Sequence, residues 1–419
     1  MKVAVVGAGI GGLVVATRLA RAGFSVDVFD AREIPGGKMF CYTNTDGISW
    51  DTGPTIISLP NEIHDTFASL GIKETPKLLP LQEGTRLSFA DGTSWQLPAT
   101  KQALVSYFKQ INTQTAQELE KILAVAEDIF NFAERELFSK EPPNQIQLAM
   151  KSLVSGFIKH SSIALNSYKK IIDNYLSDEN LREFFYHFSS YAGVTPDFGQ
   201  GALLSIAHVE LSLPLVFPKG GVYSIASHLY AAALNAKVKF FFKTKILSGI
   251  PIGTEERNRG WHLITSNKEL LKYDLVVSNC DPFVAGLTWL KNSDILSKKL
   301  LSHLNENKLR PSESQFVILF DKQDDTPLSH HTKIFPSSWR KSFLEVCNDK
   351  KIPEEPCIYL VWPHATDQSI SPRVLFISAM APNTLSTHNA WSASDCDAYC
   401  EKILGLCREK LNIPLQGRV

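Results

Sequence analysis

The chain has 419 residues, of which 44% are apolar and 21% charged, and these values are ordinary for a globular protein with a sizeable core. Lysine and arginine together number 43, and so do aspartate and glutamate, which excludes the basic footprint of a nucleic-acid-binding protein. We therefore expect about two to three domains and no nucleic-acid partner.

The cysteines and the hydropathy pattern bear on the cellular compartment. Seven cysteines are scattered, and Cys396 and Cys400 are spaced to share a helix face without a further pair to complete a metal site. We expect free thiols and no metal. The first strand starts almost at Met1, leaving no room for a signal peptide, and no apolar run reaches the ~18 residues of a spanning helix. We expect a cytoplasmic protein, and the alternative is one attached peripherally to a membrane.

The first thirty residues predict a βαβ unit. Residues 2–6 are apolar and rich in β-branched side chains, residues 7–12 read Gly-Ala-Gly-Ile-Gly-Gly, and residues 13–20 have a helical pattern. Residues 24–29 form a second apolar run that ends in Asp30. Strand, glycine turn, helix, strand and acid follow in the order that a dinucleotide-binding unit requires.

Each of these residue types suits the chemistry. Gly7 allows a sharp turn off the strand, Gly9 lets a pyrophosphate approach the backbone, and Gly12 lets the helix pack close to the strand. The helix N-terminus offers free N–H groups to the phosphates. Asp30 lies 18 residues after Gly12, where a carboxylate can accept hydrogen bonds from ribose hydroxyls. The unit alone leaves FAD and NAD open.

Two further glycine motifs follow in the next loops. Gly36 and Gly37 expose backbone N–H groups beside Lys38, which suits a second contact to a diphosphate; the alternative is an ordinary turn with a solvated lysine. Asp46-Gly47 signals a turn, and a strand from residue 49 enters the loop Asp-Thr-Gly-Pro-Thr at 51–55.

These motifs resemble the FAD/NAD(P)-binding amine-oxidase superfamily and, within it, the bacterial-type phytoene desaturase and carotenoid isomerase group. The resemblance is carried by G-x-G-x-x-G, the acid at the strand end, G-G-K and D-T-G-P-T. It implies an α/β fold: a Rossmann-like FAD-binding domain of the GR2 type, an α+β substrate domain and a helical lid. The cofactor-binding residues that we expect are Gly7, Gly9, Ile10, Gly11, Gly12, Asp30, Ala31, Arg32, Gly36, Gly37, Lys38, Gly53, Pro54, Thr55 and Ile246.

The resemblance also implies a role for each part of this set. The glycine turn and Asp30 would hold the ADP half, residues 36–38 would lie near the diphosphate and ribityl chain, and Gly53 and Pro54 would lie beside the flavin ring. The backbone of Ile246 would pair with the adenine. Many family members have Glu and Arg where this chain has Asp30 and Lys38, which keep the charge and the hydrogen-bonding role.

The remaining chain predicts a series of helices and strands. We expect a capped helix over 61–70, a hairpin over 86–97 around Asp91-Gly92, one long helix over 102–137, and an aromatic-rich helix over 180–196. A helix to residue 234 follows the motif Phe-Pro-Lys-Gly-Gly-Val at 217–222. After it we expect a single β run at 237–246, a strand at 261–265, a buried strand at 273–282, strands at 314–320, 358–362 and 374–379, and a helix over 395–411.

Several segments allow two interpretations. Residues 146–168 form a basic amphipathic stretch, either a helix on a membrane surface that admits a lipid-like substrate or a lid that packs on the core. The aromatic side chains of 180–196 either line a polyene channel or fill the core. Asn279 and Asp281 resemble the family's V-V-x-N-A-D-P motif and are either functional or caps of the strand end. We interpret the single histidines 187, 208 and 228 as structural.

The expected domains are discontinuous. The FAD-binding domain comprises 1–80 and 215–286, and the substrate domain comprises 81–100, 190–214 and 287–380. Residues 101–190 form the lid or membrane-facing region, and 381–419 a helical end. The family's third cofactor segment, a C-terminal strand, glycine-rich turn and helix, is not found, so we expect a truncated chain or an incomplete FAD site.

The expected function is that of an FAD-dependent oxidoreductase. The resemblance implies hydride transfer from an apolar, carotenoid-like polyene to the flavin, forming or rearranging C=C bonds. The alternatives are a related flavin enzyme on another lipid-like or amine substrate and a non-catalytic remnant with a defective FAD site. The sequence points to no catalytic acid or base and leaves the oligomeric state open.

Overall fold

The computed structural model describes residues 1–45, 47–138, 147, 150, 163–253, 260–291, 302, 313–370, 373–383, 391–415 and 417–418. The chain forms two compact units. Unit 1 comprises 1–79 and 217–310, and unit 2 comprises 80–216 and 311–419. The chain passes from one unit to the other three times: within β5 (Leu78–Pro80), within β8 (Val216–Pro218) and between residues 310 and 311.

Unit 1 is built on a parallel sheet of four strands in the order β13-β1-β2-β9. Its strands are β1 (Lys2–Val6), β2 (Ser25–Phe29), β9 (Lys239–Phe241) and β13 (Leu275–Ser278). The two central strands read as apolar runs because both of their faces are covered, as in other parallel sheets. The predicted strands and the helix between them are confirmed.

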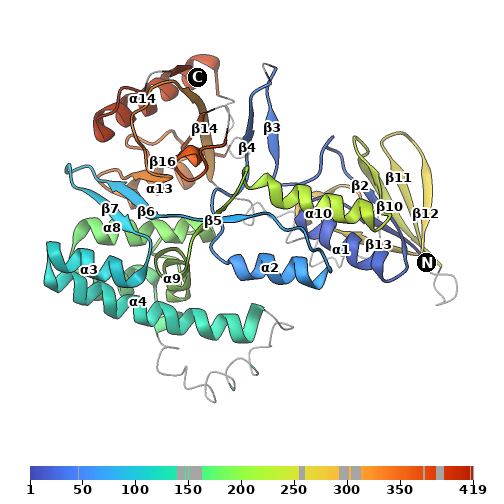
Figure 1. Ribbon diagram of the computed structural model, residues 1–419, viewed down its shortest axis with the longest axis horizontal. Helices are drawn as coiled ribbons and strands as arrows, with labels where there is room; N and C mark the ends of the chain where they lie inside the picture. The colour runs from blue at the N-terminus through green and yellow to red at the C-terminus, as the bar shows by residue number, and fades with distance from the viewer. Residues whose placement is uncertain are drawn as a thin grey trace. The chain divides into compact units, whose positions relative to one another are not determined.

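Two helices cover one face of this sheet. Helix α1 (Ile10–Arg21) connects β1 to β2, and α10 (Tyr223–Asn235) lies beside it (Figure 1). Alanines at the contact, among them Ala16 and Ala233, are fully buried and let the helices approach the β-branched residues of the sheet.

The rest of unit 1 consists of short elements. These are the hairpin of β3 (Cys41–Thr43) and β4 (Ser49–Asp51), the helices α2 (Pro60–Ser69) and α11 (Pro282–Leu287), and an antiparallel sheet of β10 (Ile246–Ile252), β11 (Gly260–Thr265) and β12 (Leu270–Tyr273). This antiparallel sheet packs on the other face of the parallel sheet through Phe29, Ile246 and Tyr273.

Unit 2 is built on a mostly antiparallel sheet of seven strands in the order β18-β14-β17-β16-β15-β6-β7. The strands are β6 (Glu83–Ser88), β7 (Ser94–Pro98), β14 (Glu313–Lys322), β15 (His331–Ile334), β16 (Ile358–Val361), β17 (Val374–Pro382) and β18 (Gly417–Arg418). Strand β15 pairs in parallel with β6, which joins the early hairpin to the late strands.

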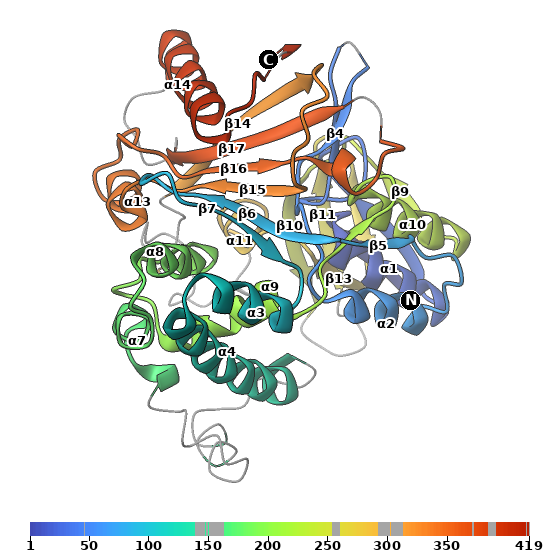
Figure 2. The same cartoon turned by 60° about the vertical axis from the view of Figure 1, so that its left-hand side comes forward.

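Helices flank this sheet, with α14 on one side and α3, α4 and α8 on the other (Figure 2). The helical elements are α3 (Lys101–Ile111), α4 (Thr113–Ala133), η1 (Glu134–Phe138), α7 (Tyr168–Tyr175), α8 (Glu179–His187), η2 (Phe188–Ala192), η3 (Gly201–Leu203), α9 (Leu204–Ser212), α13 (Trp339–Cys347), η6 (Pro363–Ala365) and α14 (Ala393–Leu411). The aromatic residues Phe184, Phe185 and Phe188 are buried in the larger hydrophobic core, so core packing accounts for them.

Three expectations were wrong in detail. The helix expected over 102–137 is two helices, because Asn112 leaves the helical conformation and caps α4. The β run expected at 237–246 is interrupted between β9 and β10, where Lys243 has φ +52°. The strand expected to be buried at 273–282 is β13, which lies at the edge of the sheet among the described residues, and Leu275 on it is 38% exposed.

The other expectations concern a helix cap, residues 146–168, membrane-spanning helices and the domains. Helix α2 begins at Pro60 without the side-chain cap that was expected. The amphipathic stretch 146–168 lies largely outside the described residues, which resume at 163. None of the helices in the described ranges combines the length and the hydrophobicity that crossing a bilayer requires. The expected Rossmann-like α/β class is confirmed, whereas the expected domain boundaries remain a prediction.

Candidate dinucleotide-binding site

The glycine turn after β1 holds two glycines that the fold itself requires. Gly7 has φ +107°, a conformation that other residues rarely adopt, and its N–H donates to Phe29 O at 2.8 Å. A Cβ on Gly12 would lie 1.9 Å from Gly7 O, so a side chain there has no room. These two glycines set how closely α1 approaches β1.

Contacts with the surrounding backbone do not require glycine at positions 9 and 11. Gly9 is the N-cap of α1 with φ −72°, which any residue adopts, and a Cβ there would come no closer than 3.3 Å to another atom. No side chain caps the helix, so its first N–H groups remain available. An open helix N-terminus among glycines fits a diphosphate, because its N–H groups and its partial positive charge both favour an anion.

Asp30 holds the glycine turn in place. Its Oδ2 accepts a hydrogen bond from Ala8 N at 2.7 Å, and its Oδ1 accepts one from Arg32 N at 2.8 Å. Each carboxylate oxygen has capacity for a further hydrogen bond, so Asp30 can still accept a ribose hydroxyl.

The second glycine motif lies directly against the first. Gly36 N donates to Ala8 O at 2.9 Å, and a Cβ on Gly37 would lie 2.9 Å from Gly9 Cα. Gly53 lies equally close to this loop, since its Cβ would come within 2.2 Å of Lys38 O. The structure therefore brings the three motifs that the sequence separates by up to 46 residues into one continuous backbone surface.

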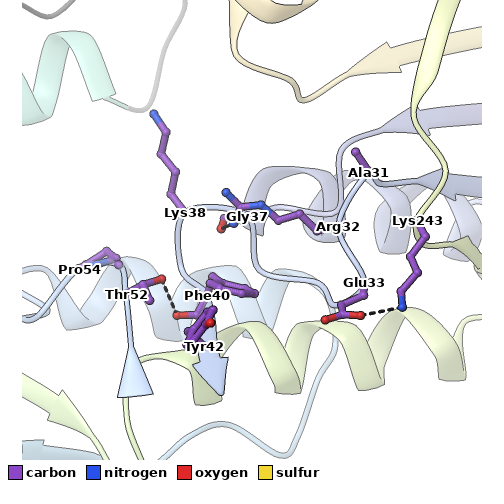
Figure 3. Close-up of a pocket in the computed structure, with 11 residues that line it drawn as sticks. Ala31, Arg32, Glu33, Gly37, Lys38, Phe40, Tyr42, Thr52, Pro54 and Lys243 are labelled. Atoms are coloured by element: carbon purple, nitrogen blue, oxygen red, sulfur yellow. Dashed lines mark hydrogen bonds and ion pairs between the residues drawn. The ribbon is translucent and has the colours of Figure 1, made fainter. Parts of the chain in front are cut away.

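A pocket of about 1,030 Å³ opens beside this surface (Figure 3). Six of the expected site residues line it: Ala31, Arg32, Gly37, Lys38, Gly53 and Pro54. The sequence did not point to the other lining residues, which are Glu33, Phe40, Tyr42, Thr52 and Lys243. Glu33 follows β2, Phe40 and Tyr42 lie at β3, Thr52 follows β4 within the D-T-G-P-T motif, and Lys243 follows β9.

The charged side chains give the pocket a positive balance. Arg32 donates to Gly37 O at 2.6 Å and lies 5.1 Å from the centre of the Phe40 ring, so it is fixed against the loop that it closes. Glu33 is paired with Lys243 at 2.7 Å, and Lys38 extends away from the hairpin (Figure 3). Arg32, Lys38 and Lys243 outnumber the single acid Glu33, and the resulting positive charge favours an anionic ligand.

Nine expected residues lie outside the pocket lining: Gly7, Gly9, Ile10, Gly11, Gly12, Asp30, Gly36, Thr55 and Ile246. The glycines and Asp30 belong to the backbone surface described above, which leaves three to place. Ile10 is the first residue of α1 and is half-buried. Thr55 is also half-buried and lies in the loop before α2. Ile246 opens β10, pairs with Thr265 and is 3% exposed, so only its backbone could serve an adenine.

The aspartate of the D-T-G-P-T motif has a role that the sequence did not indicate. The Asp51 carboxylate accepts hydrogen bonds from the backbone N–H groups of Val222 and Tyr223, where α10 begins. A Cβ on Gly221 would lie 2.6 Å from Asp51 Oδ2, so the glycine of the later motif makes room for this carboxylate. Burial raises the pKa of the Asp51 carboxyl, and the two backbone donors lower it in part.

Comparison with known proteins agrees with this geometry. A family model described as an NAD(P)-binding Rossmann-like domain matches residues 5–70. The zeta-carotene-forming phytoene desaturase of Myxococcus xanthus is 26% identical over 379 residues, which cover 88% of this chain and 70% of the relative. The lycopene-forming phytoene desaturase of Pantoea ananas is 26% identical over 407 residues, which cover 93% and 78%.

Solved structures share the fold. A variant of putrescine oxidase matches with a TM-score of 0.62 at 16% identity, covering 100% of this chain and 83% of that one. An oxidoreductase from Methanosarcina mazei matches with a TM-score of 0.58 at 16% identity, covering 98% and 84%. The chain is thus similar in sequence to phytoene and carotenoid desaturases along most of its length, and it has the Rossmann-like fold of amine-oxidase-type oxidoreductases.

Proposed function

We propose that the chain is an FAD-dependent oxidoreductase that forms or rearranges C=C bonds in an apolar polyene. The observation that carries the proposal is the sequence similarity to phytoene desaturases, which extends over 88% and 93% of this chain and is not confined to the nucleotide-binding unit. A shared Rossmann-like unit alone would be compatible with many other reactions.

The site fits FAD in chemical terms. In this proposal the turn from Gly7 to Gly12 and the N-terminus of α1 hold the diphosphate, and Asp30 holds a ribose. The loop around Gly37 adds backbone N–H groups. Gly53, whose missing side chain leaves room for Lys38 O, holds the third motif against this loop at the pocket wall where a ring system can lie. FAD is too long to be held by the βαβ unit alone. This explains why the glycine motifs around Gly37 and Gly53 lie beside the first one.

Bound FAD supplies the redox chemistry by accepting a hydride equivalent from a C–H bond of the substrate. The chain's own residues bind and orient the cofactor and keep water away. Phe40, Tyr42 and Pro54 give the pocket an apolar wall, whereas Arg32 and Lys38 face the charged part of the ligand. We assign no acid or base to this chemistry.

We also propose that the protein works at a membrane surface. A polyene without polar groups resides in the bilayer, and the sequence of 146–168 has the basic, amphipathic character of an interfacial helix. Vesicles are therefore the appropriate carrier for substrate in a test.

The test is turnover of phytoene in liposomes by the purified full-length chain with added FAD. We expect product absorbance at longer wavelengths than phytoene and a loss of two mass units for each new double bond. Omitting FAD should abolish the change, which serves as the control for non-enzymatic oxidation.

Two results would contradict the proposal in different ways. Bound FAD without any change in the polyene would rule out the desaturase activity and leave another substrate, such as an amine, to be sought. A colourless protein that titrates no FAD would support the non-catalytic alternative.

A further inference from the structure

Asn279 lies at the edge of the sheet where the glycine turn begins. It is the first residue after β13, whose Ser278 pairs with Val6 at the end of β1. Asn279 N donates to Val6 O at 2.8 Å, which fixes its backbone against β1. In a parallel nucleotide-binding sheet, this is the edge at which ligands bind.

The side chain of Asn279 turns toward the first turn of α1. Cβ atoms built on the glycines would lie 2.6 Å from its Nδ2 at Gly11, 3.3 Å from its Oδ1 at Gly9 and 3.4 Å from its Oδ1 at Gly12. The amide therefore lies beside the open helix N-terminus, over the surface that the absent side chains leave free.

The polar side chains near Asn279 are already engaged, whereas its own amide is not. Asp281 Oδ1 accepts from Phe283 N at 2.9 Å and caps α11. Asp30 accepts from two backbone N–H groups. Asn279 is exposed, and its amide makes no hydrogen bond within the described part of the chain. An exposed amide that strand capping does not use has donors to offer a ligand.

We propose that Asn279 is a cofactor-binding residue whose Nδ2 donates a hydrogen bond to an oxygen of the dinucleotide's diphosphate. The inference deepens the proposed function and rests on its claim that FAD binds at the glycine turn. An asparagine suits this position because it adds donors without adding a negative charge beside Asp30, whereas an aspartate would repel the anion.

The test measures FAD dissociation constants by quenching of flavin fluorescence for the wild type, Asn279→Ala and Asn279→Asp. Losing one hydrogen bond to a charged group should weaken binding by roughly tenfold to a hundredfold in Asn279→Ala. Asn279→Asp should bind more weakly still, because it has the same size but carries a like charge. ADP, which has the diphosphate without the flavin, should lose affinity by a similar factor.

Asp281→Asn is the matched control. It changes a polar residue of the same loop, keeps an oxygen that can cap α11, and should bind FAD as the wild type does. The melting temperatures of all variants should agree within a few degrees, since Asn279 is exposed. If Asn279→Ala does not fold, the isosteric Asn279→Asp carries the comparison.

The outcomes separate the two proposals. If the wild type binds FAD and both Asn279 variants bind it equally well, the inference about Asn279 is wrong and the proposed cofactor stands. If the wild type binds neither FAD nor ADP, both proposals fail.

Discussion

At the scale of single residues, glycines of the same turn serve different purposes. Gly7 and Gly12 are required by a positive φ and by a contact of 1.9 Å, so both would be needed in a chain that bound nothing. Gly9 has an ordinary backbone conformation, and the nearest atom to a Cβ there would be Asn279 Oδ1 at 3.3 Å, on an exposed side chain that can shift slightly. Its lack of a side chain has an explanation only if something else approaches that backbone.

Asp51 allows a test of how the glycine motifs are held together. Asp51→Ala removes the acceptor of two backbone N–H groups at the start of α10, which is expected to cost about 1–3 kcal/mol of unfolding free energy. Asp51→Asn keeps one acceptor oxygen and, because burial raises the pKa of Asp51, removes a charge that is costly to bury.

Urea unfolding should therefore rank the wild type and Asp51→Asn close together and Asp51→Ala clearly lower. Equal unfolding midpoints for the wild type and Asp51→Ala would show that the carboxylate does not support α10.

At the scale of the elements, the chain breaks between α3 and α4 because a capping side chain starts a new helix, although the apolar periodicity continues across the break. The apolar spacing continues through residues 102–137, and this periodicity predicted one helix. Asn112 Oδ1 accepts hydrogen bonds from Gln114 N at 2.8 Å and Thr115 N at 3.2 Å. An asparagine side chain that bonds the following backbone N–H groups starts a new helix at that residue.

Asn112→Ala should accordingly destabilise unit 2 by about 1 kcal/mol, the usual cost of losing an N-cap. Thermal unfolding followed by circular dichroism measures the effect. Gln110→Ala, an exposed change on α3 two residues earlier, is the control and should leave the melting temperature unchanged. If Gln110→Ala lost as much stability as Asn112→Ala, the loss in Asn112→Ala could not be assigned to the N-cap.

The elements near the site show what a sequence can and cannot predict. The βαβ unit was predictable because strand, turn and helix all follow from local patterns, and they are confirmed. That Gly37 meets Gly9 and that Asp51 caps α10 are long-range contacts, and no local pattern encodes them. The position of β13 at the edge of the described sheet and the exposure of Leu275 on it are features of the tertiary structure, so the apolar composition of that strand was misleading.

At the scale of the whole molecule, buried histidines make stability depend on pH. Burial lowers the pKa of His330 to about 4 and lowers the pKa values of His187 and His331 well below 6.5. The folded chain then binds fewer protons than the unfolded one, in which histidine has a pKa of about 6.5. Their contribution to stability is present above pH 6.5 and is lost as the pH falls toward 4.

For His330 alone, a shift from 6.5 to about 4 corresponds to roughly 3 kcal/mol of unfolding free energy across this range. Urea unfolding at pH 7.5, 6 and 5 should show this decline, and His330→Gln should flatten it. His64→Gln, at an exposed position on α2, should leave the slope unchanged. The same slope in His330→Gln as in the wild type would assign the decline to other groups.

The central claim is that FAD binds across the glycine turn, and titration of FAD into the full chain and into Gly9→Ala tests it most directly. The account predicts saturable binding to the wild type and at least tenfold weaker binding to Gly9→Ala. The variant should unfold like the wild type, because its backbone conformation is ordinary and the 3.3 Å contact of its Cβ is with the exposed side chain of Asn279, which can shift slightly. Equal affinity in the two proteins, or no binding to the wild type, would contradict the account.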